Sequence, residues 1–574
     1  MKRIIQILTG AFLIFIISCT TDFLDYTPQG KLSGDQLNKP GFMDQLVTAA
    51  YASLGNDDWP QPFSNMWQWG SVRSDDAYKG GGSVPDQGEI DIMEQFVLIN
   101  TELGKPNLIW IALYEGIGRA NDAIQRIDLL TEAEYPKKVE REAECRFIRG
   151  HFHFLLKILF KYPVWVDELT PKADIKLLTN SDFTNDQLWD KIAGDFEFAA
   201  NNLPLIQSQK GRATKAAAWS YLAKVRLYQA YEQDEKHNVI NINATKLQQV
   251  VQFCDNVINA GNNGLAPDFA DNFVTEKENG PESIFAIQFS VNDGTDHGRL
   301  NKATGLNYNM APVFGCCDFH NPSQNMVNAF KTDVNGLPMH DTFNDVSMKD
   351  PADFQTNGVD PRLDHTIGIV THPFKYDPLW VMQPSWRRAP QVYGYYSSMK
   401  EVVHYKDPSF RKYGAFHASG LNFIVIRYSD VLLMKAEALI ELGRQNEALP
   451  LINEVRTRAA NSTVRLKNQD GTFISNYRIS NYEDGVNCNW TQDYARKAMM
   501  FERRLEFAME SPRFFDLVRW GIAAETLNKY FAEEKVRYTF LSTASFKKNR
   551  DEYLPIPQQQ INLVEGIYTQ NYGW

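Results

Sequence analysis

Two groups of aromatic side chains are the residues of this chain best suited to ligand-binding chemistry. The first lies within twenty residues otherwise rich in Asp, Asn, Gln and Gly, and the second contains two adjacent arginines. A sugar ring has an apolar C–H face that stacks on an aromatic ring, and hydroxyls that need carboxylate, amide or guanidinium partners. The pattern therefore favours sugar recognition. The groups are Trp59, Trp67, Trp69 and Tyr78, and Trp380, Trp386, Arg387, Arg388, Tyr393, Tyr395 and Tyr396.

A packing interpretation of the same aromatics stays open. Large rings can hold long loops against a helical core, and for any one tryptophan this is the more common role. Replacement of Trp386 by Ala separates the two interpretations. A ligand contact predicts weaker glycan binding with nearly unchanged thermal unfolding, whereas a packing role predicts a large loss of stability with intact binding.

The sequence offers little support for catalysis or for a bound metal. Adjacent acids such as Asp75 and Asp76 are expected by chance in 574 residues with 70 acidic ones. His151 and His153 point to different faces of a helix and are interpreted as packing or surface residues. The sequence contains no C-x-x-C, H-E-x-x-H, Walker A, dinucleotide or G-x-S-x-G motif. We expect no enzyme activity, cofactor or metal, although glycosidase carboxylates have no fixed spacing and a lipoprotein glycosidase stays an alternative.

Two short runs of identical residues are unusual. Once Cys19 is set aside, five cysteines remain, and an odd number does not suggest a disulfide framework. Cys316 and Cys317 are adjacent, so they form either a strained vicinal disulfide or two reduced thiols. The glycine run at 80–82 lacks the helix that follows a phosphate-binding loop, and we expect a flexible turn there.

The start of the chain is typical of a bacterial lipoprotein. Lys2 and Arg3 precede a mostly apolar run of fourteen residues, which is too short to span a bilayer and fits a signal peptide. The Ser18-Cys19 pair predicts removal of residues 1–18 and lipidation of Cys19, with an ordinary secretory signal as the alternative. Residues 19–35 would then be a lipidated tether, and the chain would contact the membrane through its lipid anchor only.

The charge balance excludes one class of partner. The chain has 59 basic and 70 acidic residues, a formal charge of −11, and no pronounced basic run. Because phosphate binding needs a basic surface, a nucleic-acid partner is not expected.

Helical periodicity flanks a long segment that lacks it. Residues 261–420 are rich in Gly, Pro, Asn and aromatics, show a strand pattern at 283–290, and are too long for one loop. Helices are predicted over 43–54, 110–124, 147–158, 214–231, 427–442, 446–459, 494–509 and 513–530. We predict one mainly α domain over 36–574. Its parts are a helical scaffold (36–260 and 421–535), a loop-rich, irregular ligand-binding subdomain with few short strands (261–420) and an irregular end (536–574).

Several stretches, spread along nearly the whole chain, match one protein family in the family's own order. They include Asp22-Phe-Leu-Asp25 after Cys19, Tyr114-x-x-Ile117-x-Arg119-Ala-Asn121, Arg146-Phe-Ile-Arg149, Arg427-Tyr-Ser-Asp430, Glu502-Arg-Arg-x-x-Glu506, Arg513-Phe-Phe-Asp516 and Tyr553-Leu-Pro-Ile-Pro557. Together these stretches resemble the SusD/RagB family of outer-membrane nutrient-binding lipoproteins of Bacteroidetes. Their arginines and glutamates are expected to pair across helices, because a buried charge needs a partner.

This resemblance implies a scaffold of tetratricopeptide-like helix pairs and a surface position on the outer membrane. A variable, loop-rich face would bind an oligosaccharide, or peptides in some relatives, so a peptide-binding member is the first alternative. The protein would lie over a SusC-like TonB-dependent transporter and hand its ligand over. Such proteins are not enzymes.

A finer resemblance implies the ligand class and its contacts. Residues 72–81 and 315–324 resemble the corresponding stretches of family members that bind levan-type fructans. Two positions depart from those members: Pro60 falls near an asparagine and Gly104 near a stacking tryptophan, for which Trp59 or Trp67 could substitute. The resemblance and the aromatic pattern together predict a ligand-binding set of Asp58, Trp59, Trp67, Asp86, Cys316, Cys317, Trp386, Arg387, Arg388, Tyr393, Tyr395 and Tyr396.

Overall fold

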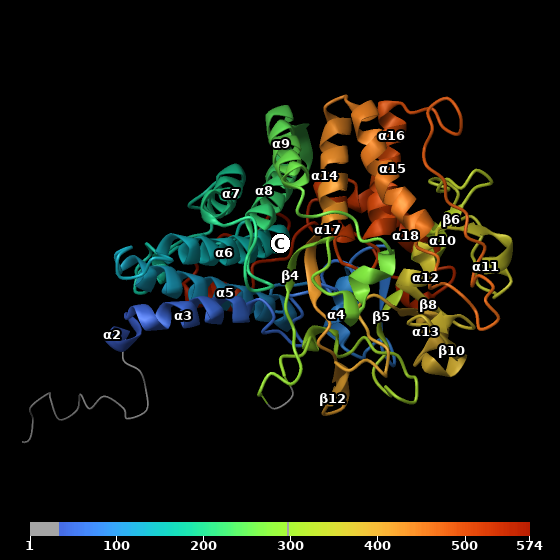
Figure 1. Cartoon of the computed structure of the whole chain (residues 1–574), viewed down its shortest axis with the longest axis horizontal. Coiled ribbons are helices and arrows are strands. Elements are labelled where there is room, and N and C mark those ends of the chain that lie inside the picture. Colours follow the sequence, from blue (N-terminus) through green and yellow to red (C-terminus); the bar gives the residue numbers. More distant parts are fainter. Residues whose placement is uncertain (1–33, 296–297) are drawn as a thin grey trace, which may run out of the picture.

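A computed structural model of the chain describes residues 34–295 and 298–574. The helices of the first half are α2 (Gly34–Leu37), α3 (Pro40–Ser53), α4 (Gly88–Gln95), α5 (Gly104–Asp128), α6 (Lys138–Phe160), α7 (Asn185–Asn202), α8 (Lys215–Ala230) and α9 (Ala244–Ala260). Successive helices from α5 to α9 pack against each other, and α3 packs on α5 (Figure 1). The helices predicted in this half are confirmed, and α2, α4, α7 and α9 are additional.

Local sequence signals set where these helices begin and end. Thr184 and Gln187 form a capping box at the start of α7, and the Thr214 side chain accepts a hydrogen bond from the Ala217 amide at the start of α8. Each such cap contributes about 1 kcal/mol. α6 ends at Phe160, shortly before Pro163, because proline cannot continue a helix.

A second group of helices follows the loop-rich segment. It consists of α14 (Tyr428–Glu441), α15 (Gln445–Asn461), α16 (Gln492–Glu506), α17 (Arg513–Arg519), α18 (Ala523–Glu534) and α19 (Gln558–Leu563). α14 packs on α9 as well as on α15 and α16, so the two groups form one helical scaffold (Figure 1). Gly443 follows α14 with φ +74°, the left-handed conformation in which a glycine commonly ends a helix.

One predicted helix is two. The pattern over 513–530 is divided into α17 and α18, because Gly521 has φ +73°, a conformation that ends an α-helix. The helical spacing of apolar residues continues through this break, so the spacing alone does not predict where the first helix ends.

The strands are short and pair in twos. They are β1 (Ala77–Gly80), β2 (Tyr231–Gln233), β3 (Val239–Ile242), β4 (Ser283–Ile287), β5 (Phe319–Pro322), β6 (Lys331–Thr332), β7 (Gly358–Val359), β8 (Ile367–Ile369), β9 (Pro373–Phe374), β10 (Asp377–Val381), β11 (Tyr396–Ser398), β12 (Arg411–Tyr413), β13 (Phe416–Ala418) and β14 (Phe423–Arg427). All pairs are antiparallel: β1 with β5, β2 with β3, β4 with β14, β6 with β7, β8 with β11, β9 with β10, and β12 with β13.

The β4–β14 pair brackets the loop-rich segment. Ile287, at the end of β4, lies opposite Phe423, at the start of β14, so the chain leaves and re-enters the scaffold at one place. The described part of the segment between them holds short strands, two 3-10 turns and four short helices, which are α10 (Gln324–Ala329), α11 (Asp353–Thr356), α12 (Arg362–Thr366) and α13 (Pro390–Tyr393). The prediction of a mainly helical chain with an irregular segment is confirmed.

Buried ion pairs join this segment to the scaffold. Glu506 of α16 accepts hydrogen bonds from Arg427 at the end of β14 (2.6 Å) and from Arg362 of α12 (2.9 Å), and all three side chains are almost fully buried. Arg458 of α15 and Glu282 pair at 2.5 Å in the same cluster. These contacts confirm that the arginines and glutamates of the family-like stretches pair across helices.

The predicted signal peptide, Cys19 and most of the predicted tether lie outside the described residues. Within the described residues, no helix is both long enough and apolar enough to cross a bilayer.

Candidate functional site

Trp59 contributes the most accessible ring of the first aromatic group. It packs against Phe416 of β13 with 5.6 Å between ring centroids, and Phe416 packs in turn on Tyr413 of β12 at 5.8 Å. The Tyr413 hydroxyl donates a hydrogen bond to Asp58 Oδ1 (3.4 Å). The β12–β13 hairpin therefore meets residues 58–59, although the two segments are far apart in the sequence.

The adjacent cysteines lie in the same apolar cluster. Cys316 and Cys317 are joined in a disulfide. Cys317 is buried, while Cys316 is half-buried and packs, like Trp59 and Phe416, against the apolar cluster that contains Cys317. Of the two alternatives for this pair, the structure has the disulfide. We call Trp59, Cys316, Cys317, Tyr413 and Phe416 the platform.

A polar edge borders the platform. Arg388 Nη1 contacts Asp86 Oδ2 at 3.0 Å and also approaches the Cys317 carbonyl at 3.4 Å. The Arg388 and Asp86 side chains are 39% and 26% exposed, so both remain accessible to a ligand. Asp58, whose pKa is raised by burial, completes this edge, which we define as Asp58, Asp86 and Arg388.

The glycine run at 80–82 is a close-packed surface and not the flexible turn expected from the sequence. Gly80 ends β1, and a Cβ at this position would lie 2.5 Å from the Asp318 carbonyl oxygen. A Cβ on Gly82 would lie 2.9 Å from the Arg388 guanidinium carbon. Only glycine lets this strand end pass so close to the residues that carry the polar edge.

Asp318 lies beneath the polar edge and positions both arginines. Its Oδ1 accepts a hydrogen bond from Arg387 Nη1 (2.6 Å), and its Oδ2 accepts one from the Arg388 backbone amide (2.7 Å). Burial raises the pKa of Asp318 to about 6, and the attraction of Arg387 offsets only part of this effect. Desolvation also lowers the pKa of Arg387. Burial thus outweighs the mutual attraction in both partners.

Besides the buried Cys317, five residues of the predicted set are enclosed by protein, whereas a side chain that stacks on a sugar must be reachable from solvent. Trp67 donates its indole N–H to the Ala303 carbonyl (3.1 Å), and Trp386 packs against Trp380 at 5.1 Å between centroids. Their positions give them packing and positioning roles beneath the surface. The five are Trp67, Trp386, Arg387, Tyr393 and Tyr396.

The remaining members of the set lie at or near the surface. Tyr395 is 49% exposed and follows Gly394, whose carbonyl accepts a hydrogen bond from Arg387 Nε (3.2 Å). The structure also brings in Tyr413, Phe416 and Asp318, which sequence reasoning missed. Tyr413 and Phe416 could have been noticed as a third aromatic pair in the loop-rich segment, but their pairing with Asp58 and Trp59 depends on tertiary structure.

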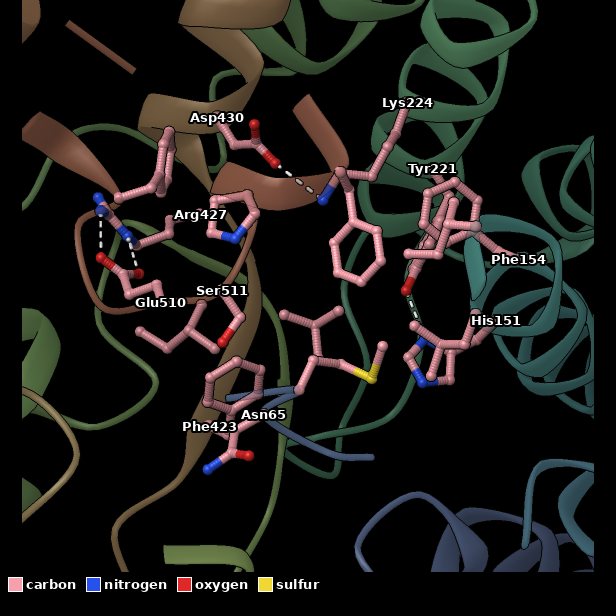
Figure 2. Close-up of a pocket in the computed structure, with 18 of the residues that line it drawn as sticks. Asn65, His151, Phe154, Tyr221, Lys224, Phe423, Arg427, Asp430, Glu510 and Ser511 are labelled. Carbon is pink, nitrogen blue, oxygen red and sulfur yellow. Dashed lines mark hydrogen bonds and ion pairs between the residues drawn. The ribbon is translucent and has the colours of Figure 1, made fainter. Parts of the chain in front are cut away.

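A separate cavity of about 100 Å³ lies in the scaffold, between α6, α8, β14 and α14 (Figure 2). Its walls combine aromatic rings with an ion pair between Lys224 and Asp430 (3.1 Å) and a hydrogen bond between Tyr221 and His151. None of the predicted site residues lines this cavity, so it is not part of the platform or its polar edge.

Comparison with known proteins identifies the family. A family model described as "SusD family" matches residues 281–574, and a second, described as "Starch-binding associating with outer membrane", matches residues 22–227. The chain belongs to the SusD family. Its tetratricopeptide-like helical architecture is that of its structural relatives.

Relatives cover the chain almost end to end at low identity. SusD-like protein P25 of Formosa agariphila is 22% identical, over 99% of both chains. A SusD homologue of Bacteroides thetaiotaomicron superposes with a TM-score of 0.70 at 20% identity, over 94% of this chain and 98% of the other. A laminarin-binding SusD-like protein superposes with a TM-score of 0.64 at 22% identity, over 93% and 100% of the two chains.

Proposed function

We propose that this SusD-family protein is a surface lipoprotein that captures an oligosaccharide on the platform and its polar edge. The observation that carries the proposal is the convergence of Trp59, the Cys316–Cys317 disulfide and Phe416 beside Asp86 and Arg388. These groups come from five separate places in the chain. An apolar surface bordered by accessible charged groups suits a sugar, which offers a C–H face and hydroxyls together.

The disulfide contributes to this surface as an apolar element. Thiols and disulfides are poor hydrogen-bonding groups, so the cysteine pair does not select a sugar through hydrogen bonds to its hydroxyls. It can fill the space beneath a sugar ring beside Trp59, while Asp58, Asp86 and Arg388 supply the hydrogen bonds. The affinity of one such shallow site is expected to be weak, about 10–1000 µM, because association costs conformational freedom and displaces water from hydroxyls.

We propose a levan-type fructan as the ligand. The positions that the finer resemblance assigns to fructan contacts include Asp58, Asp86, the cysteine pair and Arg388, and these lie together in the structure. Laminarin is the second candidate, because one structural relative is a laminarin-binding protein and another is a surface glycan-binding protein in complex with laminarihexaose.

The cellular role follows from the N-terminal sequence and the family. We propose that Cys19 carries the lipid, that the protein lies on the cell surface at the outer membrane, and that it delivers its ligand to a SusC-like TonB-dependent transporter. A family description that names association with the outer membrane supports the location. We propose binding without turnover, so release of reducing ends during incubation with a glycan would contradict this role.

Titration calorimetry of the mature chain, with Cys19 replaced by Ser, tests the ligand and the site together. Levan, inulin and laminarin are titrated separately, and a saturable isotherm with levan is the expected result. Trp59→Ala should weaken binding at least tenfold. The matched control is Trp219→Ala, which removes another partly buried tryptophan that packs on the helical core. Equal affinity of Trp59→Ala and wild type would refute the platform as the site, and binding of laminarin alone would refute the fructan assignment.

A further inference from the structure

A groove of about 440 Å³ lies between α3, β4 and the loop that precedes α8. Its walls include Tyr51 of α3, Gln288 after β4, and the loop residues Lys210 and Arg212, with Arg299 at one side. Neither the platform nor the polar edge contributes to it.

The charge of this groove is opposite to that of the chain. Lys210, Arg212 and Arg299 line it, and no Asp or Glu does so among the described residues. The whole chain, in contrast, carries a formal charge of −11. Three cations around one cavity in an acidic protein are the arrangement that concentrates an anion.

Arg299 is a partly buried cation with no carboxylate in an ion pair with it among the described residues. Its guanidinium donates to the Ala52 carbonyl. Desolvation lowers the pKa of Arg299 and outweighs the attraction of Asp57, while the like charge of Arg119 on α5 adds to the lowering. A partly buried guanidinium that forms no ion pair with the described residues can gain a charge-assisted hydrogen bond from a bound anion.

The other two cations are held differently. Arg212 donates to Glu144 (2.7 Å) and to Gln209 (2.6 Å), which fixes its guanidinium over the Tyr51 ring. Lys210 has no hydrogen bond or ion pair among the described residues, so its ammonium is available to a ligand. The groove therefore combines one fixed cation, one partly buried cation and one accessible cation.

The loop that carries Lys210 and Arg212 is built closely onto β4. Gly211 has φ +83°, and a Cβ there would lie 2.2 Å from Gln288 Cγ. Gln288 is itself held by Asn279 (3.0 Å) and Asn422 (3.0 Å). Glycine at this position lets the loop pack directly against the fixed Gln288 side chain. This contact fixes the backbone on both sides of Gly211, at Lys210 and Arg212.

We propose that this groove binds an oxyanion, a carboxylate or a sulfate group, carried on a saccharide. The proposal rests on the proposed glycan-binding function and extends it to acidic sugars. Two chain segments connect the groove to the site: Leu54 to Asp58 spans at most ~14 Å, and Arg299 to Lys302 at most ~11 Å. Lys302 touches the platform, because its carbonyl accepts a hydrogen bond from the Tyr413 hydroxyl (3.4 Å). One oligosaccharide can therefore reach both.

Calorimetric titration with sodium glucuronate and with sodium sulfate, at constant ionic strength, tests the oxyanion site directly. We expect a saturable heat with at least one probe, and the responding probe identifies the carboxylate or the sulfate. Arg299→Gln should weaken this binding at least tenfold, and Lys210→Gln several-fold. Lys548→Gln is the matched control, because Lys548 is an exposed lysine that does not line the groove.

The outcomes separate this proposal from the proposed function. No saturable heat with either probe, or unchanged binding in both Arg299→Gln and Lys210→Gln, overturns the oxyanion site. If Arg299→Gln fails to fold, the exposed Lys210 decides alone. Trp59→Ala should keep anion binding while it loses levan binding, so a failure of the platform would leave the groove result standing, and the reverse also holds.

Discussion

Asp318→Asn is expected to keep or increase stability while it weakens glycan binding. The carboxylate is buried, and burial raises its pKa from 3.8 to about 6 despite the contact with Arg387. Each pKa unit corresponds to about 1.4 kcal/mol. The ionised form is therefore disfavoured in the folded protein by about 3 kcal/mol relative to water, and a neutral amide of the same shape avoids this cost.

The sign of the pH dependence follows from the same shift. Above pH 6 the folded carboxylate is ionised and the full cost applies. As the pH falls through 6, the folded state takes up a proton that the unfolded state does not bind until about pH 4, so wild-type stability from this group rises. By pH 5 the free energy of unfolding of the wild type has risen by about 1.4 kcal/mol. The stability difference between the variant and the wild type should therefore shrink from about 3 to about 2 kcal/mol.

Binding should move in the opposite direction from stability. An asparagine at position 318 can accept a hydrogen bond from the Arg388 amide or from Arg387, but its amide nitrogen then faces the other donor. Because the Asp318 bonds hold Arg387 and the Arg388 backbone in place, the loss of one leaves the Arg388 guanidinium less well positioned at the polar edge, and we expect a several-fold weaker affinity for levan.

Urea unfolding of wild type and Asp318→Asn at pH 7.5 and pH 5.0 measures the stability difference and its pH dependence. Calorimetry at pH 7.5 measures the affinity for levan. Removal of one partner from a buried ion pair often costs about 3–5 kcal/mol. A destabilisation of that size at pH 7.5 would show that the attraction of Arg387 exceeds desolvation, and the reasoning would be refuted.

Three further predictions use the same assays. Trp386→Ala should cost about 3–5 kcal/mol in urea because its ring is buried, with a much smaller cost for Trp386→Phe; a loss under about 1 kcal/mol would contradict a packing role. Arg388→Ala should weaken levan binding with a stability change within about 1 kcal/mol, since its ion pair is accessible, and unchanged binding would remove it from the site. Glu506→Gln should cost about 3–5 kcal/mol because it leaves buried arginines unpaired, whereas the exposed Glu447→Gln serves as control; equal stability of the two would argue against the buried network.

The scaffold could be predicted from the sequence because helix faces repeat locally. Residues such as Phe147 and Phe154 recur at helical spacing and are buried on α6. The division of the helix at Gly521 was missed, because the φ angle of a glycine cannot be predicted from the apolar pattern around it. The loop-rich segment was predicted only as irregular, because its short strands pair with distant partners.

The candidate site was less accessible to sequence reasoning. Trp59 and Trp67 are similar in local sequence, yet Trp59 is half-buried and Trp67 is enclosed; only tertiary packing separates them. The pairing of Asp86 with Arg388 joins residues about 300 positions apart in sequence, and local periodicity carries no such information. The resemblance to a family placed several of these residues together, whereas composition and spacing alone did not.

The β4–β14 pair makes the segment from 288 to 422 an insertion between two paired strands, so its sequence and length can change as a unit. Because Ile287 and Phe423 are direct partners, both ends of the segment are anchored about 5 Å apart, and a replacement of different length or sequence need not disturb the helices. An incoming segment must still supply the strand that pairs with β1 and apolar side chains that pack on Phe501 and Leu505. It must also place a cation at the position of Arg362 for the buried glutamates of α16. Recognition of new ligands can therefore diverge in this segment while the scaffold stays the same.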